Sequence, residues 1–515
     1  MFRDAMQNIL EMTACEMAMR VRRRELSPVD LLDACLARIE EINPVVNAIV
    51  AIDEAGARLA AQRAEAALLG GETLGPLHGL PVAIKDLNPT RGLRTTFGSL
   101  VYRDNVPHED DLVVSRIRQA GGIILAKSNT PEFGAGANTI NRVYGATVNP
   151  FAPDLSAAGS SGGSAVALAT GMVPLASGSD MGGSLRTPAS FSGVVGHRPS
   201  AGAVPSSTRR NAWSPLSTDG PMGRTVADTA LQMAAMVGAS SKDPLSFDQS
   251  PAPFLDLEPL DLGDLRVAFS SDLGGVPVAC EVRTHFDKIA EGLAPLFKRA
   301  ERRDPELGDV HRIFETLRGA DYADAFGGFV EEHRGEAGPN VIRNVDSARM
   351  LTTLDIARAN ADQSALVRGF QSFFDDVDLL ICPAASVVPF PVEEVFVAAI
   401  DGETLPSYVT WIAITYALTL TTHPATVIPC GLGPTGLPFG IQIVGRWRDD
   451  AGTLAAAAAL ERELSRHPLL RRPVPNLGWL ATTGGTSWAG RVPAALEQHA
   501  HTLSTPLASY RNATP

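Results

Sequence analysis

The sequence has 515 residues, with 44 Lys and Arg against 57 Asp and Glu, which gives a formal net charge of −13. This acidic balance argues against broad binding of nucleic-acid phosphates, and a content of 45% hydrophobic and 20% charged residues excludes wholesale disorder. The start lacks a basic stretch followed by an apolar run, and no later segment offers 18 apolar residues free of charge, so we expect a cytoplasmic protein that neither is exported nor spans a membrane.

The first third of the chain predicts helices followed by β–α units. Ser27 can cap a helix whose first position is Pro28, and apolar residues then repeat at helical spacing until Asn43 and Pro44, where we expect the helix to stop. The elements expected after it are a strand at 48–52, a helix at 54–69, a strand at 82–84 that carries Lys85, a helix at 111–120 and a strand at 123–126. This order predicts a mixed or parallel sheet.

The same alternation returns near the end of the chain, with strands expected at 426–429 and 440–444 and a helix at 452–466. The two ends are therefore expected to share one sheet. Residues 240–400 are more polar and irregular, and there we expect a long helix at 347–374 followed by a strand at 377–381.

Two clusters of glycine and serine lie within residues 158–198 and are separated by an apolar stretch. Glycine lets backbone N–H groups converge where a side chain would block approach. The sequence Asp180-Met181-Gly182-Gly183-Ser184 can therefore form a nest of donors beside a serine, as a developing oxyanion requires.

A serine nucleophile needs a base to remove its proton. The histidines are scattered, and we interpret His197, which lies beside the second cluster, as a ring packed in the core. Lys85 differs, because it ends an apolar strand where desolvation favours the neutral amine.

These residues resemble the amidase signature hydrolases, whose hallmark is a Ser-Ser-Lys triad on a glycine- and serine-rich sequence. The resemblance covers roughly residues 10–240 and 370–466. It implies that Ser184 is the nucleophile, that Ser160 relays the proton, and that Lys85 is the base. The separations, 75 residues from Lys85 to Ser160 and 24 from Ser160 to Ser184, agree with the family pattern.

The resemblance also implies how the substrate is held. The N–H groups of Met181, Gly182 and Gly183 would form the oxyanion hole, a cis peptide bond would join Gly159 to Ser160, and the backbone carbonyl near Gly134 would accept the substrate amide N–H.

The implied fold is a single large α/β domain over residues 1–515, with a central mixed, twisted β-sheet covered by helices on both faces. Its signature core would span about 75–240 and 370–466, with a variable region at about 240–420 that forms the substrate pocket. Aromatic residues there offer apolar surface to an aryl or apolar acyl group, namely Phe326, Phe329, Tyr408, Trp411 and Tyr416.

Three departures from the family pattern and one competing motif bear on this site. Ala157-Ala158 replaces the usual Pro-Gly, Ser179 replaces a threonine, and His197-Arg198 replaces leucine-lysine. Gly-Ser-Ser-Gly-Gly at 159–163 also satisfies the Gly-x-Ser-x-Gly pattern of the α/β-hydrolases, with Ser161 as nucleophile. In the α/β-hydrolases this pattern forms a sharp turn directly after a strand, and we disfavour it here because residues 151–158 offer no apolar strand run. We expect Ser161 and Ser164 to shape the loop by hydrogen bonds instead.

The expected activity is hydrolysis of a carboxylic amide, or of a carbamate or ester, to a carboxylic acid and ammonia or an amine through an acyl-serine intermediate. The alternative is the glutaminase subunit of a tRNA-dependent amidotransferase, which would work only inside an assembly. We expect no cofactor and no metal, since the five dispersed cysteines form no Cys-x-x-Cys pair and have no histidines at ligand spacing. The expected partners are a small amide substrate and, at most, a second copy of the chain.

Overall fold

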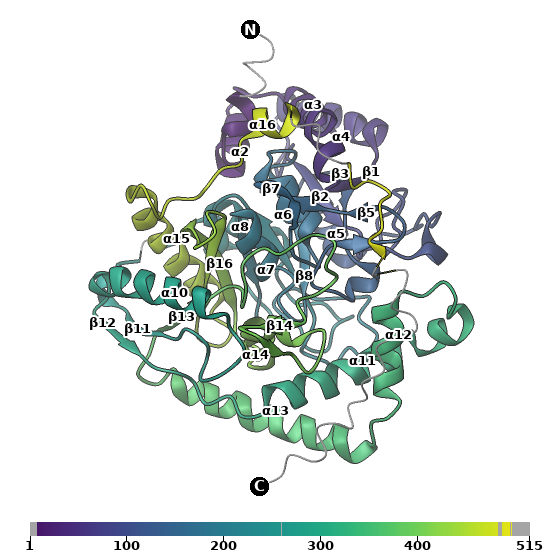
Figure 1. Ribbon diagram of the computed structural model, residues 1–515. Coiled ribbons are helices and arrows are strands. Elements are labelled where there is room, and N and C mark those ends of the chain that lie inside the picture. The colour runs from purple at the N-terminus through teal and green to yellow at the C-terminus, as the bar shows by residue number, and fades with distance from the viewer. Residues whose placement is uncertain (1–7, 259, 483–486, 495, 497–515) are drawn as a thin grey trace.

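An eleven-stranded sheet runs through the part of the protein that the computed structural model describes, which comprises residues 8–258, 260–482, 487–494 and 496 (Figure 1). In order across the sheet, the strands are β1 (Ile49–Ile52), β3 (Ile123–Ser128), β2 (Pro81–Lys85), β8 (Leu175–Asp180), β10 (Thr218–Gly223), β9 (Val195–Arg198), β16 (Ala425–Leu432), β17 (Pro438–Val444), β13 (Leu379–Pro383), β11 (Arg266–Phe269) and β12 (Arg299–Arg302). Both ends of the chain therefore contribute to one sheet, as predicted.

The sheet is mixed. β2 pairs in parallel with β3 and β8, and β11 pairs in parallel with β12 and β13, while the remaining neighbours are antiparallel. The parallel β2–β3 and β2–β8 pairs bring the ends of β2 and β8 to the same edge. Lys85 and Asp180, the last residues of these two strands, thus lie near one another in the fold.

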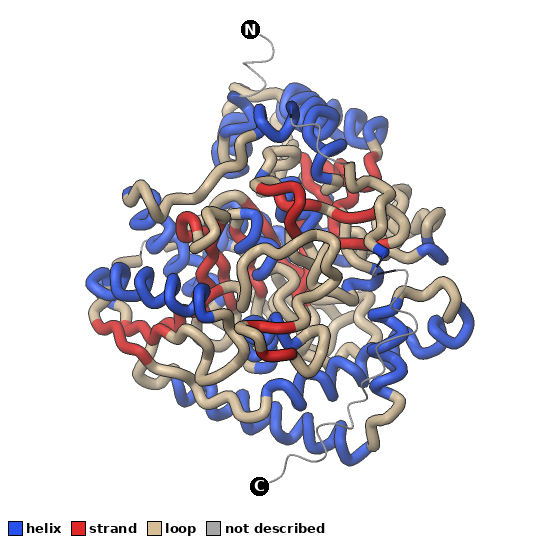
Figure 2. The backbone as a smooth tube through the Cα atoms, viewed as in Figure 1, coloured by secondary structure: helices blue, strands red, loops and turns tan. Residues whose placement is uncertain are grey.

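Helices cover both faces of this sheet (Figures 1 and 2). The short helices α6 (Gly162–Ala169) and α7 (Arg186–Ser192) pack on one face, and α8 (Val226–Met236) and α15 (Asp450–Arg466) pack on the other. The predicted α/β class with a helix-covered mixed sheet is confirmed. The other helices are α2 (Ala14–Arg22), α3 (Pro28–Val46), α4 (Glu54–Gly70), α5 (Leu112–Gln119), α9 (Ala252–Leu255), α10 (Cys280–Leu293), α11 (Val310–His333), α12 (Pro339–Ala348), α13 (Thr353–Phe373), α14 (Ala413–Leu420) and α16 (Leu477–Thr482).

Among the described residues, three two-stranded sheets lie outside the main one. They pair β4 (Ile140–Asn141) with β5 (Gly145–Ala146), β6 (Val148–Asn149) with β7 (Ala152–Ser156), and β14 (Ala399–Ile400) with β15 (Glu403–Thr404). The strand β7 was not expected, because Pro153 and Asp154 interrupt its apolar pattern. β7 pairs with the two-residue strand β6 and bridges to Pro391 through Leu155, so a short strand outside the main sheet accommodates both residues.

Two helix predictions were wrong at their ends. α3 continues through Pro44 to Val46 and is capped by Asn47, whose φ is 50°. The Asn43 side chain accepts hydrogen bonds from the N–H groups of Ala48 and Ile49 and so orders the exit from the helix. The helix expected at 347–374 is two helices, since Thr352 forms a capping box with Asp355 and starts α13 afresh.

The middle region is also more regular than predicted, because the 24-residue helix α11 and the strands β11 and β12 lie within it. Cys382 and Cys430 are buried in the core. Within the described residues, no helix is both long enough and apolar enough to cross a membrane.

Candidate active site

Lys85 ends β2 and is completely buried. Its Nζ donates to Ser160 Oγ at 2.6 Å and to Ser179 Oγ at 3.0 Å. Its backbone N–H donates to Ser177 Oγ at 3.2 Å, which fixes the end of the strand against β8. The structure therefore brings together the predicted base and the predicted relay serine.

Burial lowers the pKa of Lys85 to about 7, although the charges of Asp219 and Asp180 oppose the shift. The cause is desolvation, which disfavours the ammonium form. Near neutral pH a large fraction of this amine is uncharged and can take a proton from a hydroxyl group.

The two glycine-serine clusters meet beside this lysine. The Gly159–Ser160 peptide bond is cis, as the family resemblance implied. The N–H of Ser161 donates to the carbonyl oxygen of Ser184 at 3.1 Å, which joins the first cluster to the second. Ser160 is 2% exposed, whereas Ser184 is partly exposed. Of the two serines, Ser184 is therefore the one that an incoming substrate can reach more easily.

The backbone around Ser184 supplies N–H donors. The N–H of Gly183 is engaged, because it donates to Asp180 Oδ1 at 3.0 Å. The N–H groups of Met181, Gly182 and Ser184 have no hydrogen-bond partner within the described residues. Gly183 has a φ of 127°, and a Cβ there would lie 2.2 Å from Thr415 Oγ1, so only glycine fits the turn.

Gly134 lies beside the relay serine. A Cβ on this glycine would be 3.5 Å from Ser160 Oγ, so its backbone passes along the edge of the site. Its carbonyl oxygen accepts a hydrogen bond from the N–H of Gly136 at 2.9 Å and keeps a second lone pair for another donor.

A buried ionic network holds the turn before Ser184. The Asp180 carboxylate accepts hydrogen bonds from Arg186 Nε at 3.0 Å and Nη2 at 2.9 Å, from Arg198 Nη1 at 3.3 Å, and from the N–H of Leu185 at 3.0 Å. Burial raises the pKa of Asp180, but the two arginines outweigh it and hold that pKa below its usual range. The pair of Asp180 and Arg186 thus has a structural role in the turn.

Arg186 also ties the turn to late parts of the chain. It donates through Nη1 to the Thr415 carbonyl oxygen at 2.7 Å and through Nη2 to Thr419 Oγ1 at 2.9 Å, both on α14. Thr415 Oγ1 in turn donates to the Gly182 carbonyl oxygen at 2.6 Å. The donors beside Ser184 are therefore held from two sides.

The departures from the family pattern have local explanations. Ser179 supplies the second acceptor for the Lys85 amine. Ala158 is fully buried with a φ of 58°, so its methyl group packs into the core instead of projecting into the site. His197 is a buried core ring that bonds Thr426 Oγ1 at 2.9 Å and Asp450 Oδ1 at 3.2 Å, as predicted.

Two other serines of the first cluster, Ser161 and Ser164, have structural roles. Ser161 Oγ is buried and exchanges hydrogen bonds with the backbone of Ser179, both at 3.3 Å. Ser164 Oγ donates to the Ser177 carbonyl oxygen at 2.8 Å. Both hydroxyl groups shape the first cluster, in agreement with the role expected from the sequence.

An aromatic cluster adjoins the predicted oxyanion donors. The Phe133 ring lies 4.5 Å from that of Phe326 and 5.0 Å from that of Phe329, and Met181 packs against the same group of residues. Tyr322 completes the cluster, with its ring 5.3 Å from that of Phe326. This places partly buried aromatic surface on the side of the site where Met181 lies.

The other three aromatic residues expected in the pocket have different surroundings. Trp411 and Tyr416 are fully buried, and Tyr408 accepts hydrogen bonds from Arg318 at 2.8 Å and Asn344 at 2.6 Å. Their prediction as open apolar surface was wrong, because aromatic residues at such spacing belong to the core here.

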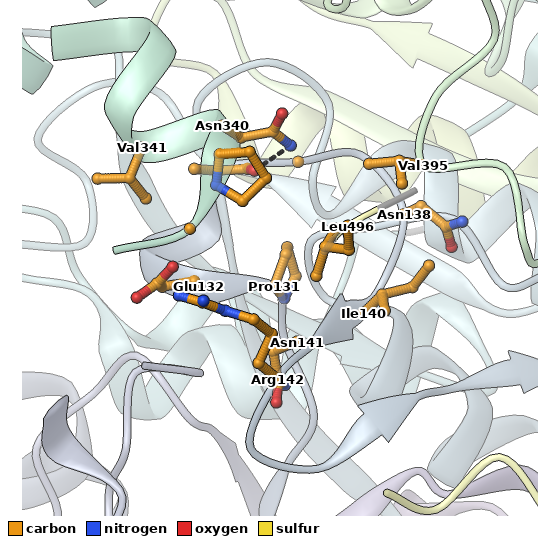
Figure 3. Close-up of a pocket in the computed structure, with 14 residues that line it drawn as sticks. Pro131, Glu132, Asn138, Ile140, Asn141, Arg142, Asn340, Val341, Val395 and Leu496 are labelled. Atoms are coloured by element: carbon orange, nitrogen blue, oxygen red, sulfur yellow. Dashed lines mark hydrogen bonds between the residues drawn. The ribbon is translucent and has the colours of Figure 1, made fainter. Parts of the chain in front are cut away.

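A small pocket is lined in part by Pro131 and Glu132, which precede Gly134 in the sequence (Figure 3). Its walls include Glu132, Arg142 and Asn340, and its cavity volume of about 20 Å³ has room for a single water molecule. Lys85, Ser160 and Ser184 are not among the residues that line it. Among the described residues, no cluster of three or more His, Cys, Asp or Glu could hold a metal ion.

The profile of the amidase family matches residues 30–454. The chain belongs to the amidase family. It is therefore an amide hydrolase, an enzyme that acts on carbon–nitrogen bonds. The chain is 35% identical to an acylamidase of Rhodococcus erythropolis over 460 residues, which cover 88% of this chain and 96% of that protein.

Other similar proteins include an amidotransferase subunit and two hydrolases of known structure. A glutamyl-tRNA(Gln) amidotransferase subunit of Thermus thermophilus is 34% identical over 480 residues, with 88% and 98% of the two chains covered. The crystal structure of a bacterial aryl acylamidase of the amidase signature family superposes with a TM-score of 0.82 at 28% identity, covering 88% and 96% of the chains. The structure of 6-aminohexanoate cyclic dimer hydrolase superposes with a TM-score of 0.80 at 26% identity, covering 91% and 100%.

Sequence reasoning missed several residues of this amidase site. Ser177 and Asn88 carry no motif of their own, and Thr415 lies far from both clusters in the sequence. Asp219 was also missed, although it lies opposite Ser179 in the β8–β10 pair. Only the pairing register of β8 and β10 could have shown that Asp219 faces Ser179. The sequence around a single acidic residue does not reveal how its strand pairs with another.

Proposed function

We propose that this amidase cleaves its substrate through an acyl-Ser184 intermediate, with Lys85 as the base and Ser160 as the proton relay. The observation that carries the proposal is the 2.6 Å hydrogen bond between Lys85 Nζ and Ser160 Oγ in a fully buried site. A neutral lysine accepts a proton from the Ser160 hydroxyl, which takes the Ser184 proton as Ser184 Oγ attacks the carbonyl carbon.

The oxyanion that forms would be stabilised by N–H groups aimed at it before the reaction begins. Those of Met181 and Gly182 are unengaged within the described residues, and that of Gly183 would have to exchange its bond to Asp180 for the oxyanion. Lys85 then returns the proton through Ser160 to the leaving nitrogen. Water repeats the sequence to release the acid, and the Gly134 carbonyl would accept the substrate N–H.

The proposed substrates carry an aryl or apolar group next to the amide, and carbamates and esters follow the same chemistry. The aromatic cluster beside Met181 supports this class, because partly buried rings favour contact with apolar and aromatic groups. The similarity to acylamidases, one of them an aryl acylamidase, agrees with it. We further propose that residues 1–515 are one domain in a cytoplasmic protein, with a homodimer as a candidate assembly.

The second candidate is a glutaminase subunit that acts with partners. It is supported by glutamyl-tRNA(Gln) amidotransferase subunits that are 32–34% identical over nearly their whole length. Purified chain should be assayed with anilides, aliphatic amides and glutamine. Hydrolysis of simple amides by the chain alone favours the first candidate, whereas turnover of glutamine alone that requires added partners favours the second.

The decisive experiment captures the acyl-enzyme by mass spectrometry after rapid acid quench. We expect a mass increase equal to the acyl group on the peptide that contains Ser184, and none in Ser184→Ala. The matched control is Ser161→Ala, which removes a neighbouring hydroxyl and should still acylate at Ser184. An adduct on any other residue would contradict the assignment.

A further inference from the structure

The antiparallel pairing of β8 with β10 brings a carboxylate to the lysine. Asp219 lies directly opposite Ser179 in this pair. Side chains of directly opposed residues lie on the same face with Cβ atoms about 4.5–5.5 Å apart. Because Ser179 Oγ is 3.0 Å from Lys85 Nζ, the Asp219 carboxylate lies in the immediate surroundings of the amine.

Asn88, three residues after Lys85, orients this carboxylate. Its side-chain Nδ2 donates to Asp219 Oδ1 at 3.2 Å and to Asp111 Oδ2 at 3.3 Å. Its backbone carbonyl oxygen accepts from Lys127 Nζ at 2.5 Å, which holds the segment in place. The orientation of Asp219 is therefore set from the same strand end that carries the lysine.

Asp219 has no salt bridge to a lysine or arginine within the described residues. The charged groups that act on it are Asp111 just before α5, Lys85 at the end of β2, and Arg209 in the preceding loop. Asp180, at the end of β8, acts on Lys85 as Asp219 does. Arg209 is already engaged by Asp243, at 2.8 and 2.9 Å. The amine of Lys85 is thus the cation most open to interaction with Asp219.

We propose that Asp219 is a positioning residue that stabilises the ammonium formed on Lys85 during acylation. This inference rests on the proposed function. As Ser184 Oγ bonds to the carbonyl carbon, its proton passes to Ser160 Oγ, the Ser160 proton passes to Lys85 Nζ, and the carbonyl π electrons move to oxygen. An oxyanion and an ammonium result. The Asp219 carboxylate, which is not in salt-bridge contact with Lys85, would stabilise the ammonium by its charge until the C–N bond breaks and the proton returns to the leaving nitrogen.

The electrostatics agree with this role. Burial and the Asp111 carboxylate raise the pKa of Asp219, while Asp219 raises the pKa of Lys85 against the effect of burial. The two groups therefore favour one another's charged forms.

The test compares pH profiles of kcat/KM for an anilide between the wild-type protein and full-length variants. Asp219→Asn removes a negative charge near Lys85 and should therefore lower the pKa seen on the acidic side, or acid limb, of the kcat/KM profile. We expect a shift of about one pH unit, which is the smallest shift typical of a nearby opposite charge. The same variant should also lower kcat about tenfold or more with little change in KM, because only the transition state contains the ammonium. Asp219→Glu should restore the limb toward the wild-type position.

Asp111→Asn is the matched control, because it loses a carboxylate bonded to the same Asn88 amide but retains Asp219. Asp111→Asn should leave the acidic side of the kcat/KM profile in place or move it to higher pH. If Asp219→Asn does not fold, Asp219→Ser makes the same test with a smaller side chain. An unmoved limb in the Asp219 variants, or a downward shift of equal size in Asp111→Asn, would overturn the proposal. An unchanged limb in Lys85→Ala would instead overturn the proposed function.

Discussion

Replacement of Lys85 by Met should remove a pH dependence of stability that the wild-type protein carries. The folded pKa of this lysine is about 7, against about 10.4 for the unfolded chain. Between these values the unfolded state binds a proton that the folded state does not, so the free energy of unfolding rises with pH in this window. Below about pH 7 and above about pH 10.4 the contribution is constant.

The size of the effect follows from these two pKa values. At pH 7 the buried neutral amine costs the folded state about 4 kcal/mol, and between pH 7 and pH 9 the wild-type protein should gain about 2–2.5 kcal/mol from this group. Met has a similar length and does not titrate. The lost hydrogen bonds to Ser160 and Ser179 lower the stability of Lys85→Met by an amount that does not depend on pH.

The assay is reversible urea unfolding of both proteins at several pH values, with Lys298→Met as a control for loss of an exposed lysine. We expect the unfolding free energy of wild type minus that of Lys85→Met to increase with pH. The corresponding difference between wild type and Lys298→Met should stay small at every pH. Parallel curves for wild type and Lys85→Met would refute the reasoning, because they would mean that Lys85 titrates alike in both states.

Four further outcomes are expected. Wild-type kcat/KM should fall about tenfold per unit below about pH 7, as Lys85 takes up a proton; a profile that stays flat there argues against a lysine base. Ser160→Ala should lower kcat by about 10²–10⁴ in steady-state assays, and near-normal turnover would exclude the relay. Asp180→Asn should lower the unfolding free energy by about 3–5 kcal/mol in urea titrations, since it leaves two buried arginines unpaired; an unaltered midpoint would contradict this. Gly183→Ala should lower both Tm and activity, because its Cβ would lie 2.2 Å from Thr415 Oγ1; an unchanged Tm would mean that the turn has room.

The sequence predicted the parts of the fold that repeat locally. The strand that carries Lys85 and the helix that starts after Ser27 were identified from apolar spacing and caps. The break before α13 was not predicted, because the apolar spacing continues across it. In the structure, the capping box formed by Thr352 marks this break. Local patterns thus give the elements more reliably than their ends.

The candidate site was predictable only where a motif marks it. Lys85, Ser160 and Ser184 were identified by a family resemblance, and the structure adds the hydrogen bond between the first two. Asp219 and Thr415 depend on strand register and on a helix far along the chain. No short-range pattern records such neighbours, so they could not be inferred from the residues alone.

The anchoring of the nucleophile turn has a consequence for biosynthesis. Arg186 bonds the Thr415 carbonyl, 229 residues further along, and Gln442, 256 residues further along. A ribosome that has just made Ser184 has produced neither of these supports. The catalytic turn can therefore reach its final shape only after most of the polypeptide has been translated, and a nascent chain released before residue 442 would carry all three residues of the proposed triad without the brace that shapes the turn.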